Sequence, residues 1–398
     1  MARLTHLPDL SAHRPFREGT FSSPLHSERV AAILGIALGV SFSICFATGL
    51  YSHFAQHPPT WFELPARPAG LYRVTQGLHV ATGIATIPIL LAKLWVIYPK
   101  LFRWPPFTNV ANVVERVSLL PLIAGGLFML GSGLANINLW YPWKFSFPVT
   151  HYWVAWITMG ALVVHVGAKR LITLRALRPS RPAEDPADPP FEAEAAAPGV
   201  LADRRGFLAG VFATSGLLTL VTVGQTFSPL AKLALLSPRR PDVGPQGFPV
   251  NRTARTAGVL ESARSPDYRF VVDGKVARPL SLTVHELRAM DQHSAVLPIS
   301  CVEGWSSSQH WTGVRMVDLL HMAGAAPGAS VTVHSLQPHR SYRTSDVNEA
   351  QSHDRDTLLA LRVGGEELDI DHGYPVRLIG PDRPGVMQTK WVTRVEVR

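Results

Sequence analysis

The chain is poor in cysteine and in charged residues. Only two of its 398 residues are cysteine, Cys45 and Cys301, and this number excludes the disulfide framework of a small secreted protein. Charged residues make up 17% of the sequence and hydrophobic residues 46%, a balance that does not suit a single soluble globule. The sequence therefore predicts a membrane protein that carries a soluble appendage.

Five stretches are long and apolar enough to span a bilayer, which takes about 20 residues. They are Val30–Phe54, Leu71–Tyr98, Val117–Ile137, Trp153–Leu174 and Phe207–Leu236. Pro88 and Pro121 fall inside two of them and would kink a buried helix without abolishing it. The fifth stretch is long for one span, so we expect it to bend or to end before Pro229.

Basic residues are distributed unevenly between these stretches. They collect before the first stretch, between the second and third, and between the fourth and fifth. This clustering explains the net charge of +9 better than a nucleic-acid-binding surface does. Because cytoplasmic segments carry the excess of Lys and Arg, we expect a cytoplasmic N-terminus and, after five spans, an extracytoplasmic C-terminal domain.

Residues 176–205 join the fourth and fifth stretches. Pro179–Gly199 is rich in Pro, Ala and acidic residues without periodicity, which predicts a flexible cytoplasmic linker. The run D-R-R-G-F-L-A-G (Asp203 to Gly210) follows directly before the fifth stretch. Its pair Arg204–Arg205 resembles the twin-arginine (Tat) signal of proteins that are exported already folded, although paired arginines also serve topology alone.

Histidines lie in or at the ends of the apolar stretches, and ionisable side chains at membrane depth are costly and usually functional. The candidates are His79 in the second stretch, His151 at the opening of the fourth span and His165 within it, whereas His53 sits at the end of the first stretch. His151 and His165 are separated by almost four helical turns, so they share a helix face about 21 Å apart. This spacing suits two stacked haems, each ligated from a facing helix. Alternatively, the histidines bond to neighbouring helices in a bundle that only anchors the protein.

From Pro241 onwards, short β-like runs alternate with turn pairs such as Asp273–Gly274. The runs are Tyr268–Val272, Val296–Ser300, Ala329–Ser335, Leu358–Val363, Val376–Ile379 and Trp391–Val397. Helical patterns intervene near Val284–Met290 and Met316–Gly324. We expect residues 241–398 to form an α+β domain that is large enough to enclose one cofactor.

Cys301 lies in the run I-S-C-V-E-G-W-S-S-S-Q-H-W (Ile299 to Trp311), which G-V-x-x-x-D-L-L follows. Most single cysteines are small buried hydrophobes, but one that ends a β-like run before Gly and Trp also suits a soft metal ligand. Together with the later H-G-Y-P-V-R-L and Q-T-K-W, these motifs resemble the sulfite-oxidase-fold molybdopterin oxidoreductases. The resemblance is nearest to the bacterial periplasmic methionine-sulfoxide-reductase branch.

This resemblance implies two-electron oxygen-atom transfer at a molybdenum ion that is held by Cys301 and by the sulfurs of the pterin. It implies catalytic roles for Cys301, Glu303 and Arg343, and cofactor contacts for Asn251, Trp305, His372 and Lys390, the last near the pterin phosphate. Arg340, Tyr342 and Arg383 are further candidates for an anionic or S=O group. The alternatives without a role at the cofactor are an exposed carboxylate at Glu303, a solvated lysine at Lys390 and a turn at His372.

The motifs G-L-H-V-A-T-G and T-H-Y-W-V-A-W resemble the four-helix b-type cytochromes of formate dehydrogenase and hydrogenase membrane subunits. That resemblance implies a haem b between His79 and His151, outer ligands of the second and fourth spans. A second haem at His165 would need an inner ligand in the first span, where Ala31, Ala32 and Ile33 stand instead. The expectation is therefore one or two haems.

Two family features are missing. The K-Y-G-F-K-S-I-K run of the methionine-sulfoxide reductases is replaced by Pro381–Lys390, and the Ig-like dimerisation domain of sulfite oxidases would have to follow Arg398. Neither branch therefore supplies the substrate. Both S- or N-oxide reduction and sulfite-type oxidation stay open.

The sequence as a whole predicts a multi-domain enzyme of the bacterial cell membrane, similar to an actinobacterial-type fusion. We expect a cytoplasmic segment (1–29), a four-helix cytochrome b-like domain (30–175), the linker with its twin arginines (176–205), a fifth helix (206–236) and an extracytoplasmic molybdopterin domain (241–398). Its partners would be membrane lipid, the quinone pool, a small-molecule substrate and, during biogenesis, the Tat machinery. The alternative is a non-catalytic, membrane-anchored binding module with a cofactor-free domain.

Overall fold

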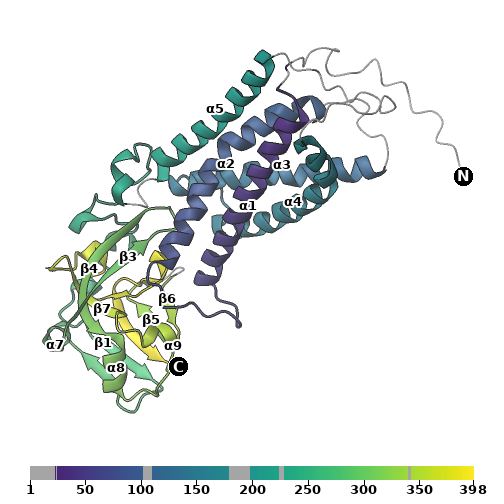
Figure 1. Cartoon of the computed structure of the whole chain (residues 1–398). Helices are drawn as coiled ribbons and strands as arrows, with labels where there is room; N and C mark the ends of the chain where they lie inside the picture. Colours follow the sequence, from purple (N-terminus) through teal and green to yellow (C-terminus); the bar gives the residue numbers. More distant parts are fainter. Residues whose placement is uncertain (1–22, 24, 102–109, 179–197, 224–227, 339–341) are drawn as a thin grey trace, which may run out of the picture. The chain divides into compact units, whose positions relative to one another are not determined.

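The computed structural model describes residues 23, 25–101, 110–178, 198–223, 228–338 and 342–398. The chain divides into two compact units (Figure 1). The first comprises Met1–Phe46 and Ala81–Thr219, and the second comprises Ala47–Val80 and Leu220–Arg398. The second unit thus contains, besides the C-terminal region, the end of the first helix, the loop that follows it and the start of the second helix.

Five helices carry most of the apolar sequence: α1 (Glu28–Gln56), α2 (Leu71–Leu101), α3 (Val110–Ile137), α4 (Phe147–Leu177) and α5 (Pro198–Val223). Each is long and apolar enough to cross a membrane, which confirms the five predicted segments. Helix α5 ends at Val223, before Pro229 as expected and well short of Leu236. The chain then turns back, because the backbone N–H of Leu236 donates to the carbonyl of Val221.

Small residues let helices of the first unit approach closely. A Cβ added at Gly125 of α3 would lie 2.2 Å from the hydroxyl oxygen of Thr158 in α4, so only glycine fits there. Ser215 of α5 donates a hydrogen bond to the carbonyl of Ala85 in α2 at 2.6 Å. Large apolar side chains such as Leu120, which is 70% exposed, stay on the outside. This distribution suits helices that are surrounded by lipid.

The C-terminal part of the second unit contains two sheets (Figure 1). The first has the order β2 (Leu280–Leu282), β1 (Phe270–Gly274), β10 (Val392–Val397), β5 (Val331–Ser335), β6 (Thr344–Val347), with β1 and β10 parallel. The second has the order β3 (His293–Ser300), β4 (Ser306–Arg315), β7 (Leu358–Val363), β8 (Glu366–Glu367), and β9 (Arg377–Ile379) pairs with β7. The short helices are α6 (Ala254–Ala257), α7 (Val284–Ala289), α8 (Met316–Ala323) and α9 (Glu349–Ser352).

The predicted strands and helices of this domain are confirmed to within two residues at most ends. Helix α7 begins at a capping box in which Thr283 and Glu286 satisfy each other's backbone N–H groups. Strand β4 was missed, because its first half reads S-S-S-Q-H and offers no apolar alternation. It pairs with the whole length of β3, from His293 opposite Gly313 to Ser300 opposite Ser306.

The sheets bury their apolar side chains in two main clusters. One cluster joins both sheets, since it contains Phe270 and Val395 of the first and Leu359 and Leu378 of the second. The other cluster includes Leu297, Trp311 and Cys301, so the sequence-predicted ligand lies at the edge of a packed core. The period of two along β3 turns one side chain inward and the next one outward.

Two neighbouring residues of β3 provide a matched test of this core. Leu297 is 1% exposed and Val296 is 67% exposed. We expect Leu297→Ala to lower the free energy of unfolding by about 2–5 kcal/mol, since it leaves a cavity. Val296→Ala should change it by no more than about 1 kcal/mol. Denaturant unfolding of the full chain in detergent, followed by tryptophan fluorescence, measures both, and equal losses would contradict the assignment of the two faces.

Candidate cofactor site

Cys301 begins the short turn that connects β3 to β4. Its backbone N–H donates to the carbonyl of Trp305 at 2.9 Å, and its own carbonyl accepts from the N–H of Gly304 at 3.0 Å. Gly304 has φ 94°, a backbone conformation that side chains other than hydrogen rarely tolerate. The cysteine is thus held by a closed hairpin end and not by a free loop.

The thiol of Cys301 is buried, with 2% of the residue exposed, and polar side chains reach it. The amide Nδ2 of Asn251 donates to the sulfur at 2.8 Å. Burial, with a smaller contribution from the charge of Glu303, raises the pKa of the thiol to about 12. A metal ion must therefore displace the proton when it binds, which is how soft cations capture buried thiols.

Glu303 and Trp305 lie beside the cysteine and are both buried. The indole Nε1 of Trp305 donates to Oε2 of Glu303 at 3.1 Å, and Nε of Arg239 lies 3.2 Å from the same oxygen. Burial raises the pKa of the Glu303 carboxyl although Arg239 opposes it. The alternative of a solvent-exposed carboxylate is therefore wrong.

Three basic side chains form a second group of the domain. His372 stacks on Phe248 with 3.6 Å between ring centroids, and its Nε2 donates to the carbonyl of Pro245 at 2.7 Å. Arg377 donates to the carbonyl of His372 at 2.9 Å. Lys390 donates from Nζ to the carbonyls of Arg252 and Asp371, at 2.6 and 2.8 Å.

Burial lowers the pKa of each member of this group. It brings the pKa of His372 to about 4 and that of Arg377 to about 9. The pKa of Lys390 falls well below its ordinary value, because of burial and then because of the charge of Arg377. The solvated-lysine alternative is wrong.

The basic group fits a phosphate-bearing cofactor. Nε of Arg377 is buried and has no hydrogen-bond partner within the described part of the chain. Buried cations that bond mainly to carbonyls are costly, and a bound phosphate would offset that cost. The residues present therefore match the anionic end of a pterin cofactor, and the Cys301 thiol matches its metal.

Other predicted residues lie elsewhere. Arg343 is exposed on the segment before β6, and Arg340 lies outside the described residues. Arg383 is 2% exposed and donates to the carbonyls of Asp346 and Met387, so it ties protein segments together. The hydroxyl of Tyr342 donates to the side-chain oxygen of Gln56 at 3.1 Å.

The histidines of the apolar helices are divided between the units. In the second unit, the imidazole of His79 fills the notch at Gly49, where an added Cβ would lie 2.8 Å from it. In the first unit, Nδ1 of His151 lies 3.3 Å from the hydroxyl of Ser132, and His165 follows on the same helix α4. Over the residues that the structure describes, no group of three His, Cys, Asp or Glu side chains could hold a metal. A molybdenum site with one protein ligand would not form such a group.

Sequence reasoning missed Arg239 and gave no role to Arg377. Arg377 stands in the quoted run H-G-Y-P-V-R-L, so the signal was present. For Arg239 the sequence offers no such signal, because it shows only an arginine in a proline-rich connector beside a second arginine.

Comparisons with known proteins agree with this geometry. Residues 257–398 match the family model described as oxidoreductase molybdopterin binding domain. This part of the chain is a molybdopterin-binding oxidoreductase domain.

Curated relatives match the chain over limited lengths. Mitochondrial sulfite oxidase of Drosophila melanogaster is 28% identical over 33% of this chain and 27% of its own length. YedZ1 of Azospira oryzae, a candidate subunit of a protein-methionine-sulfoxide reductase, is 30% identical over 31% of this chain and 47% of its own length. The oxidoreductase YuiH of Bacillus subtilis, itself uncharacterised, is 29% identical over 37% of this chain and 77% of its own length. The chain thus spans less than half of the first two relatives.

The basic group gives a test of cofactor retention. Lys390→Met keeps most of the side-chain volume but removes the charge that a phosphate would contact. We expect the purified variant to retain several-fold less molybdopterin, measured as the fluorescence of the oxidised pterin released from the protein. Lys275→Met is the control, since Lys275 is exposed after β1. Full retention in the Lys390 variant would place the phosphate elsewhere.

Proposed function

We propose that the chain is a membrane-bound molybdopterin oxidoreductase that moves an oxygen atom and two electrons to or from a small extracytoplasmic substrate. The observation that carries the proposal is the buried Cys301 thiol, held at a closed hairpin end with the Asn251 amide on its sulfur. This thiol lies within residues that match a molybdopterin-binding family. The match favours an enzyme over a non-catalytic binding module.

Each part of the site has a distinct task in this proposal. Cys301 would bind the molybdenum, and Asn251 would orient its sulfur. Lys390, Arg377 and His372 would hold the phosphate end of the cofactor. When bound, the cofactor supplies the two-electron oxygen-transfer chemistry, while the protein orients it and excludes water.

Glu303 is the group that could hold a proton beside the thiolate. Its carboxylate is buried and is fixed through one oxygen by Trp305 and Arg239. Burial raises its pKa, so proton uptake takes place nearer to neutral pH than for an exposed glutamate. Because Arg343 is exposed, we assign to it at most the attraction of a polar substrate to the surface.

The substrate class and the electron path follow from the same proposal. Relatives named as sulfite oxidase, as a methionine-sulfoxide reductase subunit and as nitrate reductase favour a small oxygen-bearing substrate, with an S- or N-oxide reduced in one direction and a sulfite-type anion oxidised in the other. Electrons would be exchanged with the quinone pool through haem b bound by His79 and His151, with His165 available for a second haem.

The same proposal sets the place of the enzyme in the cell. It would sit in the bacterial cell membrane with residues 241–398 outside. Arg204 and Arg205 lie within helix α5, near its start, and would direct export through the Tat machinery.

A variant with Arg204→Lys and Arg205→Lys tests this assignment, since it keeps the charge and loses only receptor recognition. The measurement is the location of the C-terminal domain in that variant.

Metal analysis of the purified full chain tests the central assignment. We expect stoichiometric molybdenum in the natural protein and loss of turnover in Cys301→Ser, because an alkoxide is a harder ligand than a thiolate. Cys45→Ser is the matched control, since the second cysteine lies in α1, and it should keep both metal and activity. Turnover by Cys301→Ser at the natural rate, or a natural protein without molybdenum, would refute the proposal.

The haem assignment has a separate optical test. A reduced-minus-oxidised spectrum of the natural protein should show the α-band of a low-spin haem. His79→Ala should lose that band and its quinol-dependent activity while dye-linked turnover at molybdenum continues. His57→Ala is the control, because His57 is exposed just after α1. A natural protein without any haem band would leave the helices as an anchor only.

A further inference from the structure

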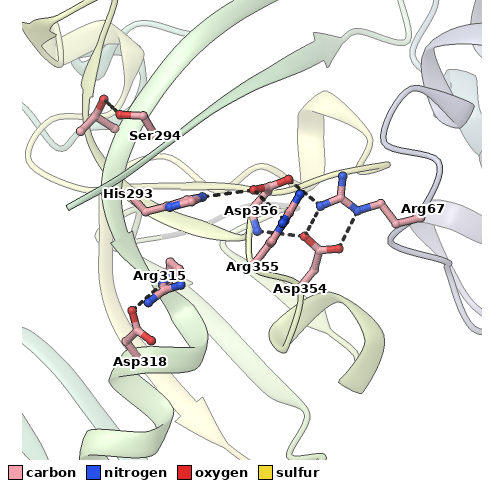
Figure 2. A network of polar contacts seen from close by, with 9 residues as sticks. Arg67, His293, Ser294, Arg315, Asp318, Asp354, Arg355 and Asp356 are labelled. Atoms are coloured by element: carbon pink, nitrogen blue, oxygen red, sulfur yellow. Dashed lines mark hydrogen bonds and ion pairs between the residues drawn. The ribbon is translucent and has the colours of Figure 1, made fainter. Parts of the chain in front are cut away.

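A segment that the sequence assigns to the membrane region belongs to the compact unit of the molybdopterin domain. This segment, Ala47–Val80, comprises the end of α1, the connecting loop and the first turns of α2. Ionic contacts hold its loop. Arg67 donates from Nε and Nη2 to the two oxygens of Asp354, both at 2.8 Å. Figure 2 shows the same guanidinium reaching Asp356, which His293 also contacts.

Asp382 fixes the ends of both helices. Its Oδ2 accepts from the hydroxyl of Tyr51 in α1 at 2.8 Å, and its Oδ1 accepts from the backbone N–H of Tyr72 at the start of α2. Its own N–H donates to the carbonyl of Ala69 at 3.0 Å. A carboxylate at a helix N-terminus satisfies an N–H that the helix itself leaves unpaired. The start of α2 is therefore set by the molybdopterin domain.

One face of α2 then lies on the Cys301 turn. Tyr72, Gln76 and Val80 follow one another at the four-residue spacing of a helix face. Tyr72 is 1% exposed and Gln76 is 5% exposed. A Cβ added at Gly304 would lie 3.2 Å from the methyl carbons of Val80, so the turn and the helix are in close contact.

Gln76 is the polar residue of this face. Its Nε2 donates to the carbonyl of Val302, the residue after Cys301, at 3.2 Å. Its Oε1 is buried and has no hydrogen-bond partner in the part of the chain that the structure describes. A buried amide oxygen without a partner is unfavourable, so such atoms are normally paired with a water or a ligand.

We propose that Gln76 is a positioning residue for the metal ligand: its amide N–H holds the Cys301 turn through Val302, and its amide oxygen accepts a hydrogen bond from an N–H or O–H group of the bound cofactor or its coordinated water. The first half concerns the polypeptide alone. The second half rests on the proposed function. On this view α2 is part of the catalytic site as well as a span.

The rival explanation is that Gln76 only adds to the packing between helix and domain. The two explanations differ in what the side chain controls. Packing is kept by a methionine, which has nearly the same length and volume but cannot hold Val302. A positioning role is lost in the methionine variant, because the hydrogen bond from the Gln76 amide to the carbonyl of Val302 is removed.

Thiol labelling of cofactor-free protein tests the first half. The full chain is prepared without molybdopterin in a Cys45→Ser background, so a maleimide probe reports Cys301 alone. Gln76→Met should speed labelling about fivefold, the factor that one hydrogen bond of ordinary strength supplies. Gln309→Met is the matched control, since Gln309 in β4 bonds to Ser307 of its own strand. Labelling at the natural rate in Gln76→Met, or equal acceleration in both variants, would overturn the positioning role.

A spectroscopic measurement on the loaded enzyme tests the second half. The Mo(V) electron paramagnetic resonance signal should shift in Gln76→Met and keep its natural g-values in Gln309→Met. An unshifted signal beside accelerated labelling would refute the contact to the cofactor and keep the contact to Val302. Because the labelling needs no molybdenum, its outcome is independent of whether the proposed function holds.

Discussion

The closed turn between β3 and β4 is the constraint on which the site depends. Two backbone hydrogen bonds, from Cys301 to Trp305 and from Gly304 to Cys301, fix the backbone of the cysteine before any ligand binds. The strands on either side pair without a break up to Ser300 and Ser306, so the turn inherits the rigidity of the sheet. A ligand held in this way loses little freedom when it binds a metal, which is the advantage of a preorganised site.

Burial shifts the pKa values of four groups in this domain, and a bound cofactor would oppose these shifts. The pKa of the Cys301 thiol is raised, and those of Lys390, Arg377 and His372 are lowered, and burial is the first cause in all four. Each shift favours the neutral form. A metal cation at the sulfur and a phosphate at the basic group would reverse both tendencies, since each brings the opposite charge. Cofactor binding and folding stability are then linked, and the loaded domain is the more stable form.

Sequence patterns located most of the fold but only part of the site. The apolar strands and the five helices have a periodicity or a length that can be read directly from the sequence. Strand β4 has no such pattern, because its first half is polar although the strand pairs with both β3 and β7. The position of Cys301 could be predicted from its motif. The contact of Arg239 with Glu303 could not, because tertiary packing decides which of two adjacent arginines turns inward. Gln76 carried a signal that hydropathy hides, since a glutamine among apolar residues of a span needs a polar partner.

The segment Ala47–Val80 shows why domain boundaries read from hydropathy differ from those set by contacts. Hydropathy assigns α1 and α2 to the membrane from end to end, yet Asp354 and Asp382 of the C-terminal domain bond to Arg67 in the connecting loop and to Tyr51 near the end of α1. An α-helix is stiff over a few turns, so Tyr72, Gln76 and Val80 move together. Tilting this part of α2 would strain the carboxylate cap at Tyr72, the hydrogen bond to Val302 and the contact with Gly304 at once. Moving this part of α2 away from the Cys301 turn would therefore also disturb the contacts of Asp382, so the start of the helix and the turn are mechanically coupled.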